Sequence, residues 1–473
     1  MVFSSPVFLF AFLPFVFLVN KALPVKLRNI FLLIMSLIFY AWGEPIYVLL
    51  MLLSVFVNYT LALAMGDKET RKGSARLWLV LCVVFNIGML VVFKYSNFMV
   101  NNVNGIFGTT LMIPLIRLPI GISFFTFQAM SYSLDVFMGG TKPQKNPGHV
   151  LLYVSLFPQL IAGPIVLYSD VEKQLDFRTE NMEKTVAGLK RFSVGLGKKV
   201  LIANAMGGVA DKVFALQGSE VNVAIAWLGA ITYSLQIYFD FSGYSDMAIG
   251  LGKMIGFDFK ENFNYPYISR SIKEFWTRWH ISLSTWFKQY LYIPLGGNRN
   301  GSFRTVLNLL IVFFCTGLWH GAQWTFVVWG LYHGLFIMLE RVGVLKPEKW
   351  KWKFLGQIYT VLVAVTAFVI FRAETFRQGF SMLGSMFAGW KMTPAMLSFL
   401  FATLTPSVIL FLVIGILGAT DLPKKLAGKV AGKLASHEIL VETISMTAAI
   451  AVFALCALSL SSTAYNPFIY FRF

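Results

Sequence analysis

Apolar runs of about twenty residues recur along the chain, and they limit its possible folds more than any other feature. One of them reads VLNLLIVFFCTGLWHGAQWTFVVWGLYHGLFIML. A helix needs about twenty apolar residues to cross the hydrocarbon core of a bilayer. The 473 residues are 57% hydrophobic and 13% charged, and a soluble domain could not bury that much apolar surface. We therefore predict an all-α polytopic membrane protein with about eleven transmembrane helices, together with re-entrant and interfacial helices.

The net charge of +18 comes from Lys and Arg residues that cluster in the loops between these runs. Such a charge suggests nucleic-acid binding in a soluble protein, but membrane proteins place Lys and Arg in their cytoplasmic loops. We therefore expect no nucleic-acid partner. The segments predicted to be cytoplasmic are 20–29, 66–76, 170–200, 341–353 and 421–433. With the apolar N-terminus retained as a first span, this orientation places both termini outside the cytoplasm.

Two apolar segments are interrupted by Pro and Gly, at 116–135 and 155–170. Irregular backbone at membrane depth is tolerated only inside protein or beside a water-filled cavity. These segments therefore suggest re-entrant elements, although ordinary Pro-kinked helices are the alternative. We find no soluble domain and no internal repeat, so we predict a single domain over residues 1–473.

His320 lies within the apolar run quoted above, between Trp319 and Gly321. A titratable group in hydrocarbon is costly and usually has a partner or a function. Sixteen residues separate it from Arg304, about 24 Å at helical rise, so we expect it deep in the membrane at a glycine-flanked break. It either takes part in chemistry or bonds a carbonyl group across helices. His333, thirteen residues further, should face elsewhere and serve packing.

A second histidine lies in the aromatic and basic stretch 269–304, whose composition is typical of an interfacial helix. On a continuous helix Trp276, His280, Ser284 and Phe287 would share one face. Taken alone, His280 is more simply explained as an interfacial histidine than as a catalytic one.

Polar groups also recur in SLQIYFDFSGYSDMAIGLG, residues 234–252. Gln236, Asp240 and Tyr244 are spaced i, i+4 and i+8 and line one helix face, whereas Asp246 lies elsewhere on the surface. Buried carboxylates must be paired, protonated or near water. This face therefore borders a wet cavity or makes bonds between helices, and we favour the cavity.

Several long stretches resemble the membrane-bound O-acyltransferase family, and within it the bacterial alginate O-acetyltransferase branch. They are FWTRWHISLSTWFKQYLYIPLGGNR, YFDFSGYSDMAIG, LWHGAQWTFVVWGLYHG, the opening MVFSSPVFLF and the closing PFIYFRF. The resemblance implies a helical membrane fold around a central funnel or tunnel, acyl transfer, and an essential intramembrane histidine that matches His320. A second family position about forty residues upstream matches His280.

The chemistry of acyl transfer suits these residues. Acyl transfer from a thioester to a hydroxyl needs a base that takes the hydroxyl proton, and a neutral imidazole can act as that base. Indoles, amides or backbone N–H groups near the break could stabilise the oxyanion. Besides catalytic His320 and His280, we predict donor-binding or tunnel-lining roles for Trp276, Arg278, Ser284, Arg299, Trp319, Gln323, Gln236, Asp240 and Tyr244. Cys82, Cys315 and Cys456 are scattered, and we expect no metal site.

We therefore expect the membrane subunit of a bacterial polysaccharide O-acetylation system in the inner membrane, with no permanently bound cofactor. Acetyl-CoA is the expected donor at the basic cytoplasmic face, where Arg278 and Arg299 would meet its phosphates. An extracytoplasmic partner acetyltransferase would complete transfer to alginate, another exopolysaccharide or peptidoglycan. One alternative is a D-alanyl transfer protein for teichoic acid with a carrier-protein donor. The other is a secondary transporter, which should show paired similar halves.

Overall fold

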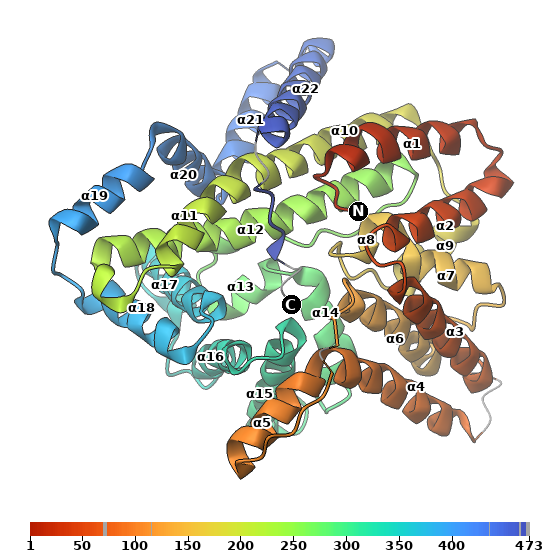
Figure 1. Ribbon diagram of the computed structural model, residues 1–473. Coiled ribbons are helices and arrows are strands. Elements are labelled where there is room, and N and C mark those ends of the chain that lie inside the picture. The colour runs from red at the N-terminus through yellow and green to blue at the C-terminus, as the bar shows by residue number, and fades with distance from the viewer. Residues whose placement is uncertain (70–72, 115, 435, 463–464, 470–473) are drawn as a thin grey trace. The chain divides into compact units, whose positions relative to one another are not determined.

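The computed structural model describes residues 1–69, 73–114, 116–434, 436–462 and 465–469, and within these ranges the chain is helical, with no strand (Figure 1). The predicted all-α class is confirmed. The chain divides into two compact units, Met1–Phe192 with Met247–Lys260, and Ser193–Asp246 with Glu261–Phe473. Two of the three divisions fall within helices α10 (Met182–Gly197) and α12 (Val223–Met254), so both helices contribute to both units, and the third follows Lys260.

The first unit contains the N-terminal helices. Its elements are η1 (Phe8–Phe12), α1 (Leu13–Ala22), α2 (Val25–Ala41), α3 (Tyr47–Met65), α4 (Ala75–Leu90), η2 (Val91–Tyr95), α5 (Ser96–Phe107), α6 (Ile122–Met138), α7 (Pro147–Ser155), α8 (Phe157–Leu160) and α9 (Tyr168–Asp176). Residues 161–167 are buried without being helical, which supports an irregular interior element in the predicted segment 155–170. The other broken segment forms a regular helix from Ile122 onwards.

The second unit contains the remaining helices and all of the predicted site residues. Its elements are η3 (Lys198–Ala203), α11 (Asn204–Phe214), η4 (Gly218–Glu220), η5 (Pro266–Ile268), α13 (Ile272–Arg278), α14 (Ile281–Phe287), η6 (Lys288–Tyr292), α15 (Gly301–His320), α16 (Trp324–Arg341), η7 (Pro347–Lys349), α17 (Lys353–Arg372), α18 (Phe376–Ala388), α19 (Pro394–Thr403), α20 (Pro406–Gly418), α21 (Leu422–Lys433) and α22 (Glu438–Ser462).

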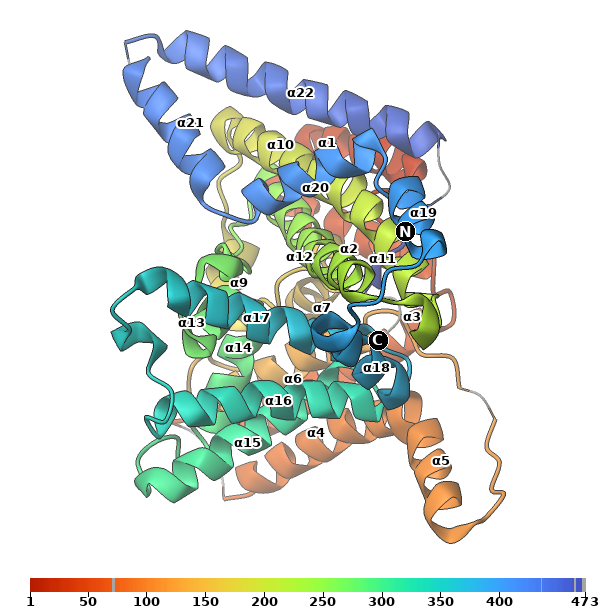
Figure 2. The same ribbon diagram turned by 90° about the vertical axis from the view of Figure 1, so that its left-hand side faces the viewer.

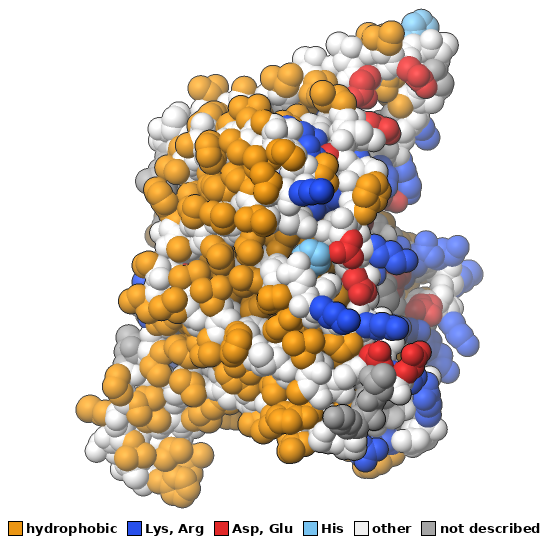
Figure 3. Space-filling view, turned by 90° about the vertical axis from the view of Figure 1, so that its right-hand side faces the viewer, with side chains coloured by type: hydrophobic (Ala, Val, Ile, Leu, Met, Phe, Trp, Pro, Cys, Tyr) orange, Lys and Arg blue, Asp and Glu red, His pale blue; other side chains and the backbone are white. Residues whose placement is uncertain are grey.

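Five stretches of described helix are long and apolar enough to cross a membrane, and the bent pair α19–α20 makes a sixth. The five are Tyr47–Met65, Ala75–Phe107, Gly301–His320, Lys353–Arg372 and Glu438–Ser462. Large apolar side chains cover much of the face shown in Figure 3, and charged side chains gather along one edge. This distribution is typical of a multi-pass membrane protein. The count of eleven spans stays a prediction, because many helices here are short or interrupted.

Helices α15, α16 and α17 form the frame around His320 and lie side by side (Figure 2). Two glycines allow α15 and α16 to approach closely. A Cβ at Gly317 would come within 2.5 Å of the Phe326 carbonyl oxygen, and a Cβ at Gly330 would collide with the carbonyl oxygen of Phe313. Phe326 on α16 also contacts Phe371 on α17, with ring centroids 4.8 Å apart. The three helices are therefore tightly packed where α15 ends.

Candidate active site

His320 is the last residue of α15, and the chain breaks directly after it. Gly321 is extended, with φ −179° and ψ 159°, and α16 begins at Trp324. A Cβ at Gly321 would collide with the ring of Phe326. The predicted glycine-flanked break is confirmed. The imidazole is buried at 2% exposure, so the surrounding side chains fix its environment.

His280 does not lie within a helix, so the prediction of one continuous face over Trp276, His280, Ser284 and Phe287 is wrong. Helix α13 ends at Arg278 and α14 starts at Ile281, and His280 between them is left-handed, with φ 45° and ψ 55°. This backbone conformation costs a non-glycine residue about 1–2 kcal/mol. It persists because the loop residue Asn262 binds both the backbone and the side chains at the break.

The indole of Trp319 lies against both histidines. Its ring centroid is 5.7 Å from that of His280 and 5.0 Å from that of His320. The separation of the two imidazoles cannot exceed the sum of those distances. The two imidazoles are therefore close together, with the Trp319 indole in contact with both rings, and neither histidine lines the cavities described below.

One cavity, which we call the lysine-rich pocket, has a volume of about 590 Å³ between α13, α14, α15 and the end of α16. Its cations are Lys273, Lys288, Arg341, Lys346 and Lys349, and its acids are Glu340 and Glu348. The predicted residues Trp276 and Ser284 line it. Its wall thus combines an apolar inner part with a positively charged rim.

The two arginines predicted to meet the donor do not line this pocket. Arg278 donates to Glu274 at 2.9 Å and to the backbone oxygen of Asn264 at 3.1 Å, so it braces the end of α13. Arg299 lies in the turn before α15. Donor binding by these two residues stays a prediction, and four lysines and Arg341 supply the positive charge in the pocket.

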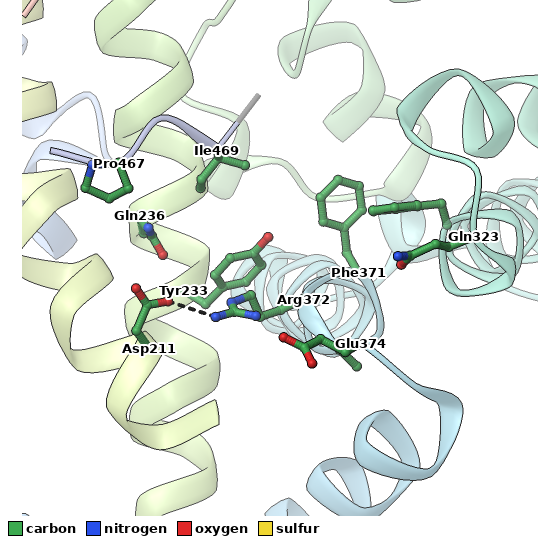
Figure 4. Close-up of a pocket in the computed structure, with 11 residues that line it drawn as sticks. Asp211, Tyr233, Gln236, Gln323, Phe371, Arg372, Glu374, Pro467 and Ile469 are labelled. Atoms are coloured by element: carbon green, nitrogen blue, oxygen red, sulfur yellow. Dashed lines mark hydrogen bonds and ion pairs between the residues drawn. The ribbon is translucent and has the colours of Figure 1, made fainter. Parts of the chain in front are cut away.

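A second cavity, of about 490 Å³, includes residues of the C-terminal segment in its wall (Figure 4). We call it the tail pocket. Its lining residues are Asp211, Tyr233, Gln236, Gln323, Phe326, Phe371, Arg372, Ala373, Glu374, Pro467 and Ile469. The predicted lining residues Gln236 and Gln323 are both present. Arg372 forms an ion pair of 2.8 Å with Asp211.

His320 is connected to the walls of both pockets through aromatic rings. Phe371, in the wall of the tail pocket, lies 5.3 Å from the His320 ring. Trp329 lies 4.9 Å from His320 and 5.8 Å from Trp276, a residue of the lysine-rich pocket. Trp329 and Phe371 also contact each other at 5.0 Å, so both rings lie on the same side of the imidazole. One series of aromatic contacts beside His320 thus joins the two pocket walls.

The polar face of α12 is not a uniform cavity wall, which corrects the interpretation of Asp240. Its carboxylate forms an ion pair of 2.7 Å with Lys199, and both side chains are 2% exposed. Tyr244 stacks on Phe468 at 4.8 Å. Of the three, Gln236 alone lines one of the two pockets described above. Of the two alternatives, a wet cavity and bonds between helices, we favoured the cavity, but a buried lysine pairs with Asp240. Lys199 is therefore no surface cation of the predicted cytoplasmic segment 170–200.

The C-terminal segment 465–469 is a part of the site that the sequence did not indicate. The backbone N–H of Ile469 donates to Asp240 at 2.8 Å, and Lys199 donates to the backbone oxygen of Pro467. The hydroxyl of Tyr465 donates to Asp211 at 2.7 Å. No local pattern marks these contacts, because 229 residues separate Ile469 from Asp240.

His333 packs near the site, and its neighbours are aromatic. Its ring lies parallel to Phe275 at 6.0 Å and contacts the edges of Trp276 at 5.3 Å and Trp329 at 5.2 Å. Within the described residues neither ring nitrogen has a hydrogen-bond partner. The packing role remains the simplest interpretation, since His333 lines neither pocket.

The sequence model of the membrane-bound O-acyltransferase family matches residues 144–383. The chain is 41% identical to the probable alginate O-acetylase of Azotobacter vinelandii over the full length of both proteins. It is 37% identical to the peptidoglycan O-acetyltransferase of Helicobacter pylori, with 82% of this chain and 80% of that protein aligned. Identity to the teichoic acid D-alanyltransferase of Bacillus subtilis is 27% over 53% of this chain.

Proposed function

The chain belongs to the membrane-bound O-acyltransferase family, and from this membership we propose that it acetylates an extracytoplasmic polysaccharide with acetyl-CoA as donor. The observation that carries the proposal is the buried His320 at the end of α15, whose neighbours Phe371 and Trp329 connect it to the tail pocket and, through Trp276, to the lysine-rich pocket. The relatives named for alginate and peptidoglycan acetylation suggest the acceptor class. The more distant D-alanyltransferase makes a D-alanyl donor on a carrier protein the weaker alternative.

The lysine-rich pocket suits the donor. Acetyl-CoA carries several phosphate charges, and lysine ammonium groups bind phosphate as point charges. Lys346 and Lys349 belong to the basic segment 341–353, which we assign to the cytoplasmic side by the positive-inside rule. The apolar inner wall around Trp276 and Phe313 would accept the thioester arm. The donor's charged end thus stays at the rim while its acetyl group points inward.

In the proposed reaction His320 acts as the general base. The acceptor hydroxyl oxygen attacks the thioester carbonyl carbon while an unprotonated ring nitrogen takes the hydroxyl proton. Collapse of the tetrahedral intermediate breaks the carbon–sulfur bond, and the imidazolium returns its proton to the thiolate. Indole N–H groups among the surrounding tryptophans are the available donors for the oxyanion. The aromatic rings exclude water, which would otherwise hydrolyse the thioester.

The tail pocket suits the acceptor side. Its amides Gln236 and Gln323, with the Asp211–Arg372 pair and Glu374, offer hydrogen bonds to a hydroxyl-bearing group. We propose that it opens to the outside, where a separate partner acetyltransferase completes transfer to the polysaccharide. The two pockets would then be the two ends of one funnel or tunnel.

The proposal includes a location and a topology. The protein would act as one catalytic domain over residues 1–473 in a bacterial inner membrane. Eleven spans, with both termini outside the cytoplasm, bring the basic loops to the donor side.

A transfer assay tests the proposal. Membranes containing the protein are incubated with radiolabelled acetyl-CoA and candidate glycans, with and without the secreted partner. We expect label in one glycan class, dependent on the partner and lost in the His320→Ala variant. If a D-alanyl carrier protein is consumed and acetyl-CoA is not, the alternative replaces this proposal.

A further inference from the structure

The backbone of His280 is held in a conformation that few residues adopt. Within the described residues only His280 and Tyr265 combine a side chain with positive φ. Strained positions persist only where the surroundings determine them, and they gather at functional sites. The surroundings here are the loop 262–265, which lies beside the α13–α14 break.

Two backbone hydrogen bonds join the loop to the break. The N–H of Asn264 donates to the oxygen of Arg278 at 2.9 Å, and the N–H of Ile281 donates to the oxygen of Asn262 at 2.9 Å. They bracket His280 on both sides. The side chain of Asn262, fully buried, then lies directly against the histidine.

The hydrogen bonds of Asn262 fix the direction of its amide. Its Oδ1 accepts from the backbone N–H of Ser282 at 3.1 Å and from the Ser282 hydroxyl at 2.9 Å. Its Nδ2 donates to the hydroxyl of Ser245 on α12 at 3.2 Å. Because a backbone N–H can only donate, the atom that faces Ser282 must be the oxygen.

This direction determines the tautomer of His280. The same Oδ1 lies 3.2 Å from the Nδ1 of His280, so Nδ1 must carry the proton to form a hydrogen bond. In a neutral imidazole the other nitrogen is then an acceptor. Nε2 of His280 is buried and has no hydrogen-bond partner among the described residues.

We propose that Asn262 is a positioning residue for acyl transfer, which holds His280 in the left-handed conformation and in the tautomer that leaves Nε2 as an acceptor beside Trp319. The inference rests on the proposed function. It assigns His280 the role of accepting a hydrogen bond from a substrate N–H or O–H group. A neutral imidazole in this tautomer has no proton at Nε2 and cannot serve there as an oxyanion donor.

The surroundings of His280 make this role sensitive to charge. Its ring contacts Phe241 from α12, Phe263 from the loop and Trp319 from α15, all uncharged. The titratable groups nearest in sequence to these contacts are Asp240, Tyr244 and Asp246 on α12, Glu261 just before the loop, Tyr265 in the loop and His320 on α15. Burial lowers the pKa of His280, because an imidazolium loses its hydration inside the protein. A carboxylate at position 262 would oppose this effect.

The test compares Asn262→Asp with Asn262→Leu. The aspartate still accepts from Nδ1 and from Ser282, but its charge stabilises the imidazolium and raises the pKa of His280. Only neutral His280 can accept a hydrogen bond at Nε2, so activity is lost as the pH falls and His280 becomes protonated. In Asn262→Asp this acid limb of the pH–activity profile should lie about one pH unit or more above that of the wild type. Asn262→Leu should lose roughly tenfold or more in kcat at every pH, since the ring is no longer oriented.

Matched controls separate positioning from stability. Asn222→Asp changes another buried asparagine, whose Oδ1 accepts from the N–H of Ile225 at the start of α12, and should leave the acid limb unmoved. Ser245 accepts the hydrogen bond from Asn262, so Ser245→Ala should lower kcat severalfold. Ser234 is a buried serine on the same helix, and its hydroxyl donates to a backbone oxygen of that helix. Ser234→Ala should therefore leave kcat unchanged.

The outcomes are distinguishable from failure of the proposed function. If the wild type transfers acetyl, His320→Ala does not, and folded Asn262→Asp keeps the wild-type acid limb, then the positioning role is refuted and the proposed function stands. Should the wild type fail to use acetyl-CoA, the proposed function fails first. A melting temperature close to that of the wild type establishes that each variant is folded.

Discussion

At the scale of single residues, the environment of His320 supports the role of general base proposed for it. Rings of Trp319, Trp329 and Phe371 lie 5.0, 4.9 and 5.3 Å from it. With the imidazole only 2% exposed, these rings exclude water from it, which suits a base that acts on a hydroxyl beside a thioester. The same rings connect it to the walls of both pockets.

We expect His320→Ala to remain folded and membrane-inserted and to lose acetyl transfer by about 10²–10⁴-fold, the usual contribution of a general base. Radiolabel transfer at matched expression measures the loss. His437→Ala is the control, because His437 is exposed in the turn before α22 and should not matter. Acetylation at the wild-type rate by well-expressed His320→Ala would end the assignment.

The buried pair of Lys199 and Asp240 should show how the C-terminal segment is held. Removing one partner leaves an uncompensated buried charge, so Lys199→Met should lower the free energy of unfolding by about 3–5 kcal/mol. Limited proteolysis should also release the segment, since Lys199 binds the Pro467 carbonyl. The double variant Lys199→Met/Asp240→Leu should recover much of the melting temperature.

The exposed pair of Lys425 and Asp421 provides the comparison, with side chains 65% and 33% exposed. Lys425→Met should change the free energy of unfolding by less than about 1 kcal/mol. Equal losses in Lys199→Met and Lys425→Met would contradict the importance assigned to the buried pair.

At the scale of elements, the contact between α15 and α16 positions the histidine. Gly330→Ala places a methyl group against the Phe313 carbonyl oxygen and should cost about 1–3 kcal/mol of stability. Because α15 ends at His320, kcat of this variant should fall together with its stability. Gly384→Ala on α18 meets nothing within 4 Å and should be neutral or slightly stabilising. Thermal melts and acetyl-transfer rates of the two variants test this expectation. Equal melting temperatures and equal rates in Gly330→Ala and Gly384→Ala would contradict it.

The sequence predicted those parts of the site that depend on local pattern. Glycines on both sides of Trp319–His320 predicted the break, and polar residues at depth predicted that Gln236 and Gln323 would line a cavity. The break at His280 was missed because no Pro or Gly stands in TRWHIS. It depends on Asn262, eighteen residues away, just as Asp240 depends on Lys199 and Ile469. Contacts between distant segments leave no periodic trace.

At the scale of the whole molecule, orientation connects the pockets to their compartments. Single cysteines in 66–76, 341–353 and 421–433, in a background without Cys82, Cys315 and Cys456, should resist impermeant thiol reagents in whole cells. Residue 473, which lies outside the described residues, should react. Labelling of 341–353 from outside would reverse the assignment of the lysine-rich pocket to the donor.

The last prediction concerns that pocket as an electrostatic donor site. Lys346→Glu combined with Lys349→Glu should raise the KM for acetyl-CoA by roughly tenfold or more with kcat little changed, because these charges would bind the donor remote from the reacting carbonyl. The dependence of kcat/KM on salt should weaken as well, since fewer charges attract the anion. Lys429 on α21 is also a lysine but lies outside the pocket. The KM of the Lys429→Glu variant for acetyl-CoA should therefore stay near that of the wild type. A fall in kcat at unchanged KM would place these lysines in the chemical step and move the donor's phosphates elsewhere.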